Sequence, residues 1–276
     1  MERDMNYRLI ALDVDGTLIN DRYELTERTK RTVRDVHRAG ATIVLCTGRS
    51  PVNTLPLMEE LGLEGTLITH NGAATIRSSD REIVHEFPFT VAELGELVRY
   101  CRERRIHMDV CSPFRLFVEG EPGETEAAMY RKFMLEPTVV DDVLSLPEPP
   151  VKFTIFGEPE TMDRVETDWA AMKGALNVIR SGDRFIDVMH AEATKGNALK
   201  RLAESLGIDR SQVMAIGNYF NDVEMIRFAG LGIAMDNSPD GVKREADAVT
   251  ASNNDDGVHE ALVRYVLNGS PTNPGS

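Results

Sequence analysis

The sequence predicts an α/β fold, in which a doubly wound, mostly parallel sheet is interrupted by an inserted α+β domain. Short apolar runs alternate with segments of helical periodicity at both ends of the chain, which is typical of a parallel sheet covered by helices. The middle of the chain replaces this alternation with closely spaced pairs of strands. A length of 276 residues leaves room for two domains of ordinary size.

The first strands and the first helix follow one another in regular order. Apolar runs at residues 7–12, 41–46 and 66–68 predict buried parallel strands, because each run is short and nearly continuous. Residues 26–39 carry apolar side chains at helical spacing, and Gly40 is placed to end that helix. This order implies right-handed crossovers between parallel strands.

A second helix is expected directly after the strand at 41–46. Ser50 and Pro51 are typical of an N-cap and a first helical residue. Pro56 lacks an N–H group, so it is expected to break or kink the helix that follows.

The inserted domain is expected at residues 83–189, which leaves 1–82 and 190–276 as one discontinuous core domain. A hairpin is predicted around residues 78–80, where turn-forming residues separate two short segments, and a proline-rich link lies at 147–150. In this part of the chain, strands are predicted at 74–77, 82–87, 106–110, 115–119, 151–156, 177–180 and 185–190, and helices at 90–105, 124–134 and 160–173.

The alternation of helices and strands resumes after Thr194. The predicted helices cover 195–206, 222–229, 239–246 and 257–267, and the predicted strands cover 212–216 and 231–234. The tail from Asn268 to Ser276 has little apolar surface to bury, so it is expected to be disordered.

Composition argues against several classes of partner. Lys and Arg total 31 against 45 for Asp and Glu, and the formal net charge of −14 would repel a nucleic acid. No apolar run approaches the roughly 18 residues of a membrane span. The three cysteines are Cys46, Cys101 and Cys111, an odd number without a C-x-x-C pair, so no disulfide framework is indicated. We therefore expect a cytoplasmic protein without nucleic-acid or membrane partners; its oligomeric state leaves no signal in the sequence.

Polar residues follow the predicted core strands at the points where those strands end. Asp13 and Asp15 come after the first strand, and Thr47 follows the second. Lys195 opens the first helix after the insertion, and the segment 217–222 follows a later strand. Ligands of open α/β sheets bind beyond the carboxyl ends of the strands. The sequence therefore predicts a site that combines carboxylates, a hydroxyl, an amine and amide oxygens.

These motifs together resemble the haloacid dehalogenase superfamily, in particular its Cof-type sugar-phosphatase-like branch, which has a Rossmann-like core and a large inserted cap. The resemblance extends from Leu9 to about Leu267. It rests on the order and spacing of Asp13 to Thr17, Thr47-Gly48-Arg49, Asn71-Gly72-Ala73, Lys195-Gly196, Asn221-Asp222, Ala234-Met235-Asp236-Asn237 and Asn253 to Val258.

The resemblance implies a Mg²⁺-dependent phosphatase that acts on a small phosphorylated metabolite, such as a sugar phosphate. It implies that Asp13 is the nucleophile, which forms an aspartyl phosphate, and that Asp15 is the acid and base. Exclusion of water and a neighbouring carboxylate are expected to favour that role of Asp15. Thr47 and Lys195 complete the implied catalytic set, because they would hold phosphoryl oxygens.

The resemblance also implies a metal site and a substrate-binding set. Mg²⁺ prefers oxygen ligands, which Asp13, the main-chain carbonyl of Asp15, Asn218 and Asp222 would provide. The implied substrate-binding residues are Gly48, Arg49, Asn71, Gly72 and Asn221.

Asn218 departs from the family pattern, which usually has an aspartate at this position. An asparagine offers a carbonyl oxygen but no charge, so Mg²⁺ would bind more weakly or Asp222 would carry more of the coordination. Asn218 could instead order its loop through hydrogen bonds, as asparagine commonly does. Two other functions stay open at this point: a phosphomutase on the same scaffold, and a non-catalytic protein that binds phosphate.

Overall fold

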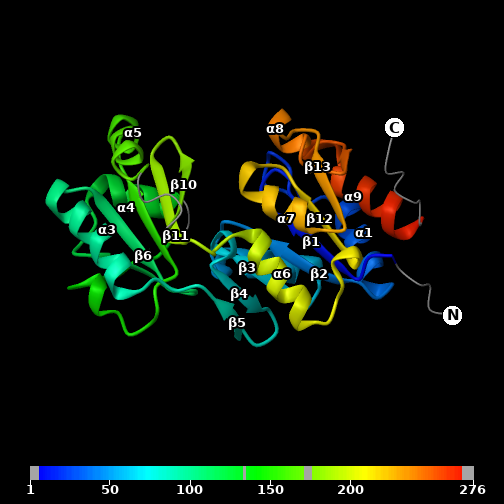
Figure 1. Cartoon of the computed structure of the whole chain (residues 1–276), viewed down its shortest axis with the longest axis horizontal. Helices are drawn as coiled ribbons and strands as arrows, with labels where there is room; N and C mark the ends of the chain where they lie inside the picture. The colour runs from blue at the N-terminus through cyan, green and yellow to red at the C-terminus, as the bar shows by residue number, and fades with distance from the viewer. Residues whose placement is uncertain (1–5, 133–134, 171–175, 269–276) are drawn as a thin grey trace. The chain divides into compact units, whose positions relative to one another are not determined.

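The computed structural model describes residues 6–132, 135–170 and 176–268. The chain forms two compact units: the first comprises the chain up to His85 together with the part from Thr194 onward, and the second comprises Glu86–Ala193 (Figure 1). The expected domain limits at 82/83 and 189/190 each lie a few residues away from these. Strand β5 (Ile83–Glu86) extends the sheet of the first unit, and β11 (Phe185–His190) pairs within the second sheet.

The first unit is built on an eight-stranded sheet with the order β14-β13-β12-β1-β2-β3-β4-β5. The strands from β14 to β3 are parallel to their neighbours, and β4 is antiparallel to β3. The order reverses direction at β1, where Leu12 pairs with Ile216 on one side and Asp13 with Cys46 on the other. Besides β5, the strands are β1 (Leu9–Asp13), β2 (Thr42–Cys46), β3 (Thr66–Thr69), β4 (Ala74–Arg77), β12 (Val213–Gly217), β13 (Leu231–Met235) and β14 (Ala248–Thr250).

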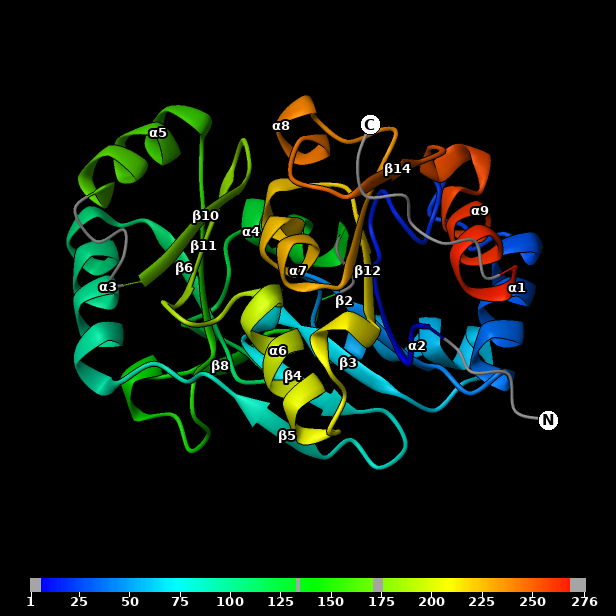
Figure 2. The same cartoon turned by 45° about the vertical axis from the view of Figure 1, so that its right-hand side comes forward.

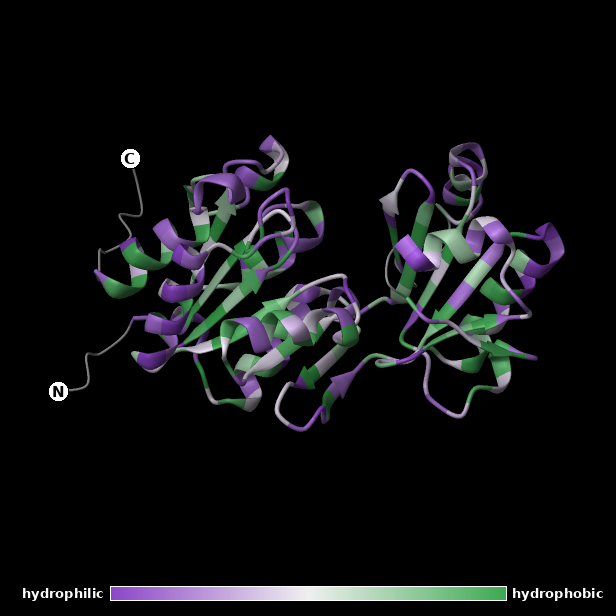
Figure 3. Cartoon of the chain, turned by 180° about the vertical axis from the view of Figure 1, so that it is seen from behind, coloured by the Kyte–Doolittle hydropathy of each residue, from purple (hydrophilic) through white to green (hydrophobic). Residues whose placement is uncertain are grey.

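Helices cover both faces of this sheet, as the prediction of a doubly wound fold requires. Helices α6 (Lys195–Ser205) and α7 (Val223–Phe228) lie on one face, while α1 (Glu27–Arg38) and α9 (Gly257–Leu262) lie on the other (Figure 2). The side chains of α6 and α7 join a buried apolar cluster with alternate residues of β1, β2 and β12. The central strands of this sheet are accordingly coloured mostly as hydrophobic (Figure 3).

Helix α2 (Pro51–Leu61) begins as predicted but runs through Pro56 without a break. Ser50 is its N-cap, and the Ser50 hydroxyl accepts a hydrogen bond from the amide of Asn53. Of the two expected effects of Pro56, the break is therefore wrong, while the kink stays a prediction. The missing N–H of Pro56 would have bonded the carbonyl of Val52, and both residues are exposed, so water can satisfy that carbonyl.

Other differences in the first unit concern short elements. The predicted helix 239–246 is reduced to α8 (Asp240–Lys243), and the predicted helix 257–267 changes after α9 into π-helical turns at Val263–Leu267. Strand β14 was not expected. The tail that was expected to be disordered lies, from residue 269 onward, outside the described residues.

The second unit is built on a six-stranded sheet with the order β10-β11-β9-β6-β7-β8. Helices α3 (Val91–Arg104) and α5 (Pro159–Asp168) pack on one face, and α4 (Glu124–Lys132) packs on the opposite face through Tyr130. The strands are β6 (His107–Cys111), β7 (Leu116–Glu119), β8 (Thr138–Val140), β9 (Lys152–Phe156), β10 (Leu176–Gly182) and β11.

The elements of this unit match the prediction except in three places. Strand β8 was not expected. Helix α5 ends at Asp168, and the last residues of the predicted helix 160–173 lie outside the described part of the chain, as do residues 133 and 134 of the predicted helix 124–134. In the described ranges of both units, no helix is long and apolar enough to cross a membrane.

Candidate active site

The site is assembled where β1 and β12 end and where α6 begins. Asp13 is the last residue of β1, and Asn218 directly follows β12. The Thr194 hydroxyl caps α6 by accepting a hydrogen bond from the Asn197 amide at 3.1 Å, which places Lys195 in the first turn. These positions lie at the point where the strand order reverses, as expected for a ligand site in an open sheet.

A buried ion cluster of Asp13, Lys195 and Asp222 forms the centre of the site. The Lys195 ammonium lies 2.7 Å from Asp13 Oδ1 and 2.6 Å from Asp222 Oδ1. Lys195 is 1% exposed, Asp222 1% and Asp13 4%. Burial by itself would lower the pKa of Lys195, but the two carboxylates outweigh it and raise that pKa, so the lysine is held as a cation.

Asp13 is the member of this cluster that is left incompletely paired. Its Oδ2 is buried and, among the described residues, no group donates a hydrogen bond to it. Burial, and then the nearby Asp222 carboxylate, raise the pKa of Asp13 to about 7, although Lys195 opposes the shift. A buried carboxylate oxygen without a partner is costly, so this atom is suited to receive a ligand.

Asp222 is held firmly by its own loop. Its Oδ2 accepts hydrogen bonds from the main-chain amides of Asn218 at 2.8 Å and Tyr219 at 3.0 Å. A Cβ atom at Gly217 would approach the Asp222 Cβ to 2.6 Å, so only glycine fits where β12 ends. Asp222 therefore fixes the turn after β12 while it pairs with Lys195.

Asp15 lies apart from this cluster and forms a bidentate ion pair with Arg49. Its carboxylate oxygens lie 2.9 Å from Arg49 Nε and 2.6 Å from Nη2. The Asp15 side chain is 48% exposed. The expectation that water is excluded around Asp15 is therefore not met in this structure.

The predicted phosphate-binding residues come together around the end of β2. Thr47 is fully buried, and its hydroxyl accepts the Arg49 amide at 3.1 Å, which leaves the hydroxyl hydrogen available to another acceptor. The Asn71 carboxamide accepts a hydrogen bond from Asn221 at 2.9 Å. A Cβ atom at Gly48 would lie 3.1 Å from the Asn71 oxygen, so Gly48 and Asn71 are neighbours.

Gly72 allows the start of α6 to approach this region closely. Its φ of 101° is in the range that favours glycine, and a Cβ atom there would lie 2.8 Å from the Lys195 amide nitrogen. Gly72 therefore acts in the site by positioning the first turn of α6, and any substituent would push Lys195 away from Asp13.

Asn218 turns its side chain toward the loop that follows β1. The Asn218 carboxamide oxygen accepts a hydrogen bond from the Thr17 hydroxyl at 3.3 Å, and its nitrogen lies against Gly16. These contacts are those of a residue that orders its surroundings, and they still leave a lone pair on the oxygen.

Two asparagines that the sequence reasoning did not single out hold the same loop from the other side. Asn237 donates a hydrogen bond to the Gly16 carbonyl at 2.8 Å and accepts one from the Asn253 amide at 3.1 Å. The Asn253 side chain donates to the Ile19 carbonyl at 3.2 Å and to Asp21 at 2.9 Å. Both asparagines stand in segments that carried the family resemblance, which was the one available signal.

The residues present fit a magnesium ion through a mixed set of oxygens. Within the described ranges, no three His, Cys, Asp or Glu side chains lie close enough to hold a metal by themselves. The open Asp13 Oδ2 and a free lone pair on Asp222 Oδ1 provide carboxylate ligands. The Asn218 carboxamide and the Asp15 carbonyl would have to supply the remaining protein ligands.

Comparison with known proteins identifies the family. A model of haloacid dehalogenase-like hydrolases matches residues 10–262. The Bacillus subtilis protein YxeH is 34% identical over 272 residues, covering 95% of this chain and 99% of YxeH. The 5-amino-6-(5-phospho-D-ribitylamino)uracil phosphatase YcsE, also from B. subtilis, is 29% identical over 269 residues, covering 96% of this chain and 98% of YcsE.

A solved structure agrees with this assignment. A haloacid dehalogenase-like hydrolase from Bacteroides thetaiotaomicron superposes with a TM-score of 0.83 at 30% identity, covering 94% of this chain and 99% of that one. The chain therefore belongs to the haloacid dehalogenase-like hydrolase family, and it is a phosphatase of that family. The predicted family and fold class are confirmed.

Proposed function

We propose that this phosphatase hydrolyses a small phosphorylated metabolite, a sugar phosphate, through an aspartyl phosphate on Asp13. The observation that carries the proposal is the state of the Asp13 carboxylate. Lys195 fixes one oxygen, while the other is buried and has no donor among the described residues. A carboxylate oxygen to which no side chain or amide donates keeps its lone pairs available for attack on phosphorus.

The first half-reaction transfers the phosphoryl group to Asp13. A bond forms between an Asp13 carboxylate oxygen and phosphorus while the bond from phosphorus to the leaving oxygen breaks. Asp15 gives its proton to that leaving oxygen, so the leaving group departs as an alcohol. In the second half-reaction, water attacks the phosphorus, Asp15 takes the water proton, and the Asp13 carboxylate is restored as phosphate departs.

The ion pair between Asp15 and Arg49 has a part in this sequence. The Arg49 guanidinium occupies both oxygens of the Asp15 carboxylate, whereas the acid role requires one of these oxygens to face the leaving oxygen. A phosphate dianion offers Arg49 a second bidentate partner. We infer that arrival of the phosphate draws Arg49 off Asp15 and thereby leaves the Asp15 carboxyl free to face the leaving oxygen.

The other residues of the site would hold the phosphate. Lys195, the Thr47 hydroxyl and the Gly48 amide would contact its oxygens. The hydrogen bond between Asn221 and Asn71 holds the turn after β12 to the turn after β3. Mg²⁺, held by Asp13, Asp222, Asn218 and the Asp15 carbonyl, would supply positive charge that stabilises the phosphoryl group.

The name of one relative supports the substrate class. The name of the relative YcsE describes a substrate with a phosphorylated ribityl chain, which is a small phosphorylated polyol. We propose that the second unit acts as the cap that selects among such substrates, as the family resemblance implies.

We also propose that the protein resides in the cytoplasm. The three cysteines are free and buried, which agrees with a reducing compartment such as the cytoplasm.

The test is to assay a panel of phosphorylated sugars and polyols with and without Mg²⁺, in water labelled with ¹⁸O. The proposal predicts Mg²⁺-dependent release of phosphate that contains one labelled oxygen. Isomerised sugar phosphate without free phosphate would instead identify a phosphomutase. Tight phosphate binding without turnover would identify a non-catalytic protein.

A further inference from the structure

The loop that follows β1 borders an open pocket that Asp15 helps to line, and we propose that this pocket receives the leaving group of the substrate and discriminates against anionic leaving groups. Under this proposal, Tyr23 covers a neutral or cationic polyhydroxylated group, and Asp21 repels a second phosphate or a carboxylate. The inference rests on the proposed function, because it uses Asp15 as the group that protonates the leaving oxygen.

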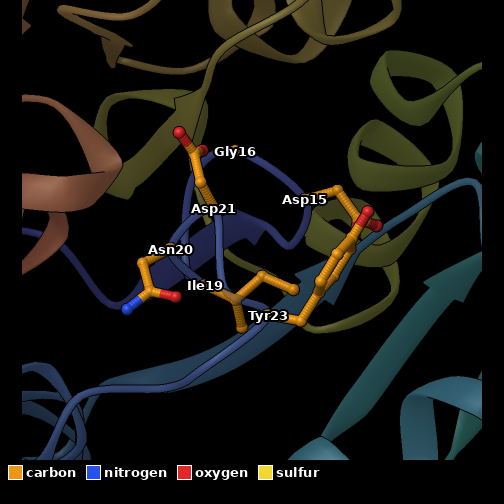
Figure 4. Close-up of a pocket in the computed structure, with 6 residues that line it drawn as sticks. All are labelled: Asp15, Gly16, Ile19, Asn20, Asp21 and Tyr23. Carbon is orange, nitrogen blue, oxygen red and sulfur yellow. The ribbon is translucent and has the colours of Figure 1, made fainter.

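The pocket has the position and size that a leaving group needs. Its volume is about 310 Å³, and its lining is Asp15, Gly16, Ile19, Asn20, Asp21 and Tyr23 (Figure 4). All six residues belong to one loop of the first unit. Asp15 must contact the oxygen that leaves phosphorus, so whatever is attached to that oxygen extends into the space that Asp15 borders.

The loop around the pocket is fixed rather than merely exposed. The Asn20 carboxamide oxygen accepts the main-chain amides of Arg22 at 2.9 Å and Glu24 at 3.0 Å, which closes a tight turn. Asn253 and Asn254 both donate to the Asp21 carboxylate at 2.9 Å. These contacts hold the pocket wall in one shape before a ligand arrives, which lowers the entropy that binding must overcome.

Tyr23 is an unusual residue for the place that it occupies. Its φ of 61° lies in the left-handed region that bulky residues seldom adopt, and its side chain is 77% exposed. A glycine or an asparagine would fit this backbone with less strain. The exposed ring at the pocket mouth provides a flat apolar surface, on which the C–H groups of a sugar or polyol can pack.

The charge of the lining determines which leaving groups the pocket favours. Two of its six residues are acidic and none is basic. Arg49 pairs with Asp15. Among the described residues, Asp21 is held by the neutral side-chain amides of Asn253 and Asn254, which also lower the pKa of the Asp21 carboxyl and keep it ionised. An anionic leaving group would meet this uncompensated charge, while a hydroxyl could donate to it.

The first experiment measures the role of the ring. Tyr23→Ala should raise KM for glucitol 6-phosphate by roughly two- to tenfold, in proportion to the loss of one aromatic contact. Tyr23→Phe keeps the ring and should behave like wild type. Acetyl phosphate, whose acetate leaving group is too short to reach the ring, should be hydrolysed equally by all three proteins. Equal changes for both substrates, or no change for either, would overturn the role of Tyr23.

The second experiment measures the role of the charge. Glucitol 6-phosphate and 6-phosphogluconate differ only in a terminal alcohol or carboxylate, and the proposal predicts that kcat/KM favours the alcohol by roughly three- to tenfold at low salt. Asp21→Asn and high ionic strength should each reduce this ratio. Glu59→Gln, which removes an exposed charge from the end of α2, should leave it unchanged.

The ratio compares two substrates in one protein, so it does not depend on how much of a variant is folded. A ratio near one in wild type, or a ratio that Asp21→Asn leaves unaltered, overturns this inference while the proposed function stands. Failure of the wild-type protein to hydrolyse any phosphate ester overturns the proposed function, and this inference with it.

Discussion

Both units bury two carboxylates and one lysine on a sheet, but they complete the hydrogen bonds of these groups differently. In the first unit, Lys195 pairs with Asp13 and Asp222 where parallel strands end, and Asp13 Oδ2 keeps no donor among the described residues. In the second unit, the Lys152 ammonium lies 3.0 Å from the Asp187 carboxylate. Asp187 and Asp109 flank Thr154 on the two strands that pair with β9.

The second cluster is satisfied by side chains within its own sheet and helix. The Thr154 hydroxyl donates to Asp187 at 3.0 Å, and the Tyr130 hydroxyl donates to Asp109 at 3.2 Å. Mid-strand positions surround a carboxylate with cross-strand neighbours, whereas the end of a parallel strand leaves one side open. The two clusters therefore differ in the open oxygen of Asp13 rather than in burial or charge, and we propose that this oxygen makes the first cluster the reactive one.

The largest difference should be in turnover. Asp13→Asn removes the nucleophile and should lower kcat by at least about 10³-fold, while Asp109→Asn should leave kcat within about threefold, because no step of the proposed mechanism uses it. Steady-state phosphate release by both purified variants, with circular dichroism to verify folding, provides the comparison. Comparable losses in the two variants would remove the distinction.

Substitution of Lys195 and of Lys152 should differ in whether Mg²⁺ restores the lost stability. Lys195→Met leaves two buried carboxylates without their cation and should cost about 3–5 kcal/mol of unfolding free energy. Mg²⁺ should restore part of this stability, because it can take up the open Asp13 oxygen. Lys152→Met should be destabilised as well, but without rescue by Mg²⁺. Thermal unfolding of both variants across a Mg²⁺ titration checks this, and equal responses to Mg²⁺ would contradict it.

The second cluster, formed by Lys152, Asp187 and Asp109, should contribute to the pH dependence of the free energy of unfolding. Burial, with a contribution from Asp187, raises the pKa of Asp109 to about 7, although Lys152 opposes the shift. Because the folded state then keeps a proton that the unfolded state releases, the contribution of Asp109 to stability falls as pH rises from about 4 to about 7. The slope should reach at most about 1.4 kcal/mol per pH unit. Denaturant unfolding of wild type and Asp109→Asn across this range should show a flatter curve for the variant.

The smallest expected effect comes from a third carboxylate in the first cluster. Asn218→Asp should lower the Mg²⁺ concentration for half-maximal activity by several-fold, because it adds a charged oxygen near the proposed metal. It should also raise KM, because it repels the phosphate dianion. Overlapping Mg²⁺ titrations of the two proteins would show that Asn218 orders the loop through Thr17 and does not face the metal.

Much of the fold could be predicted because apolar runs and caps are local signals. The buried core strands were found within one or two residues, Ser50 caps its helix as expected, and α6 begins at Lys195 as predicted. Strands β8 and β14 were missed because each is three residues long and only partly buried, so neither leaves an apolar run. Pro56 misled the prediction because its effect depends on whether water reaches the carbonyl of Val52.

The part of the candidate site that lies at the ends of strands and the start of a helix could be predicted from the sequence. The three cluster residues come together because Asp13 ends β1, Lys195 begins α6 and Asp222 lies in the turn after β12. The pairing of Asp15 with Arg49 could not be predicted, because it joins two loops whose side-chain directions depend on tertiary packing. Asn253 stood in a motif of the family resemblance but was not among the expected site residues; it is 5% exposed and holds the loop after β1.

The most direct test is to find where the phosphoryl group resides during turnover. The protein and its Asp15→Asn variant are mixed with substrate labelled in the phosphoryl group, quenched in acid within milliseconds, and mapped by mass spectrometry. We predict a label on the peptide that contains Asp13, which hydroxylamine removes and which accumulates further in Asp15→Asn if hydrolysis is slowed more than transfer. A label on another residue, or turnover without any covalent label in either protein, would contradict the assignment of Asp13 as the nucleophile.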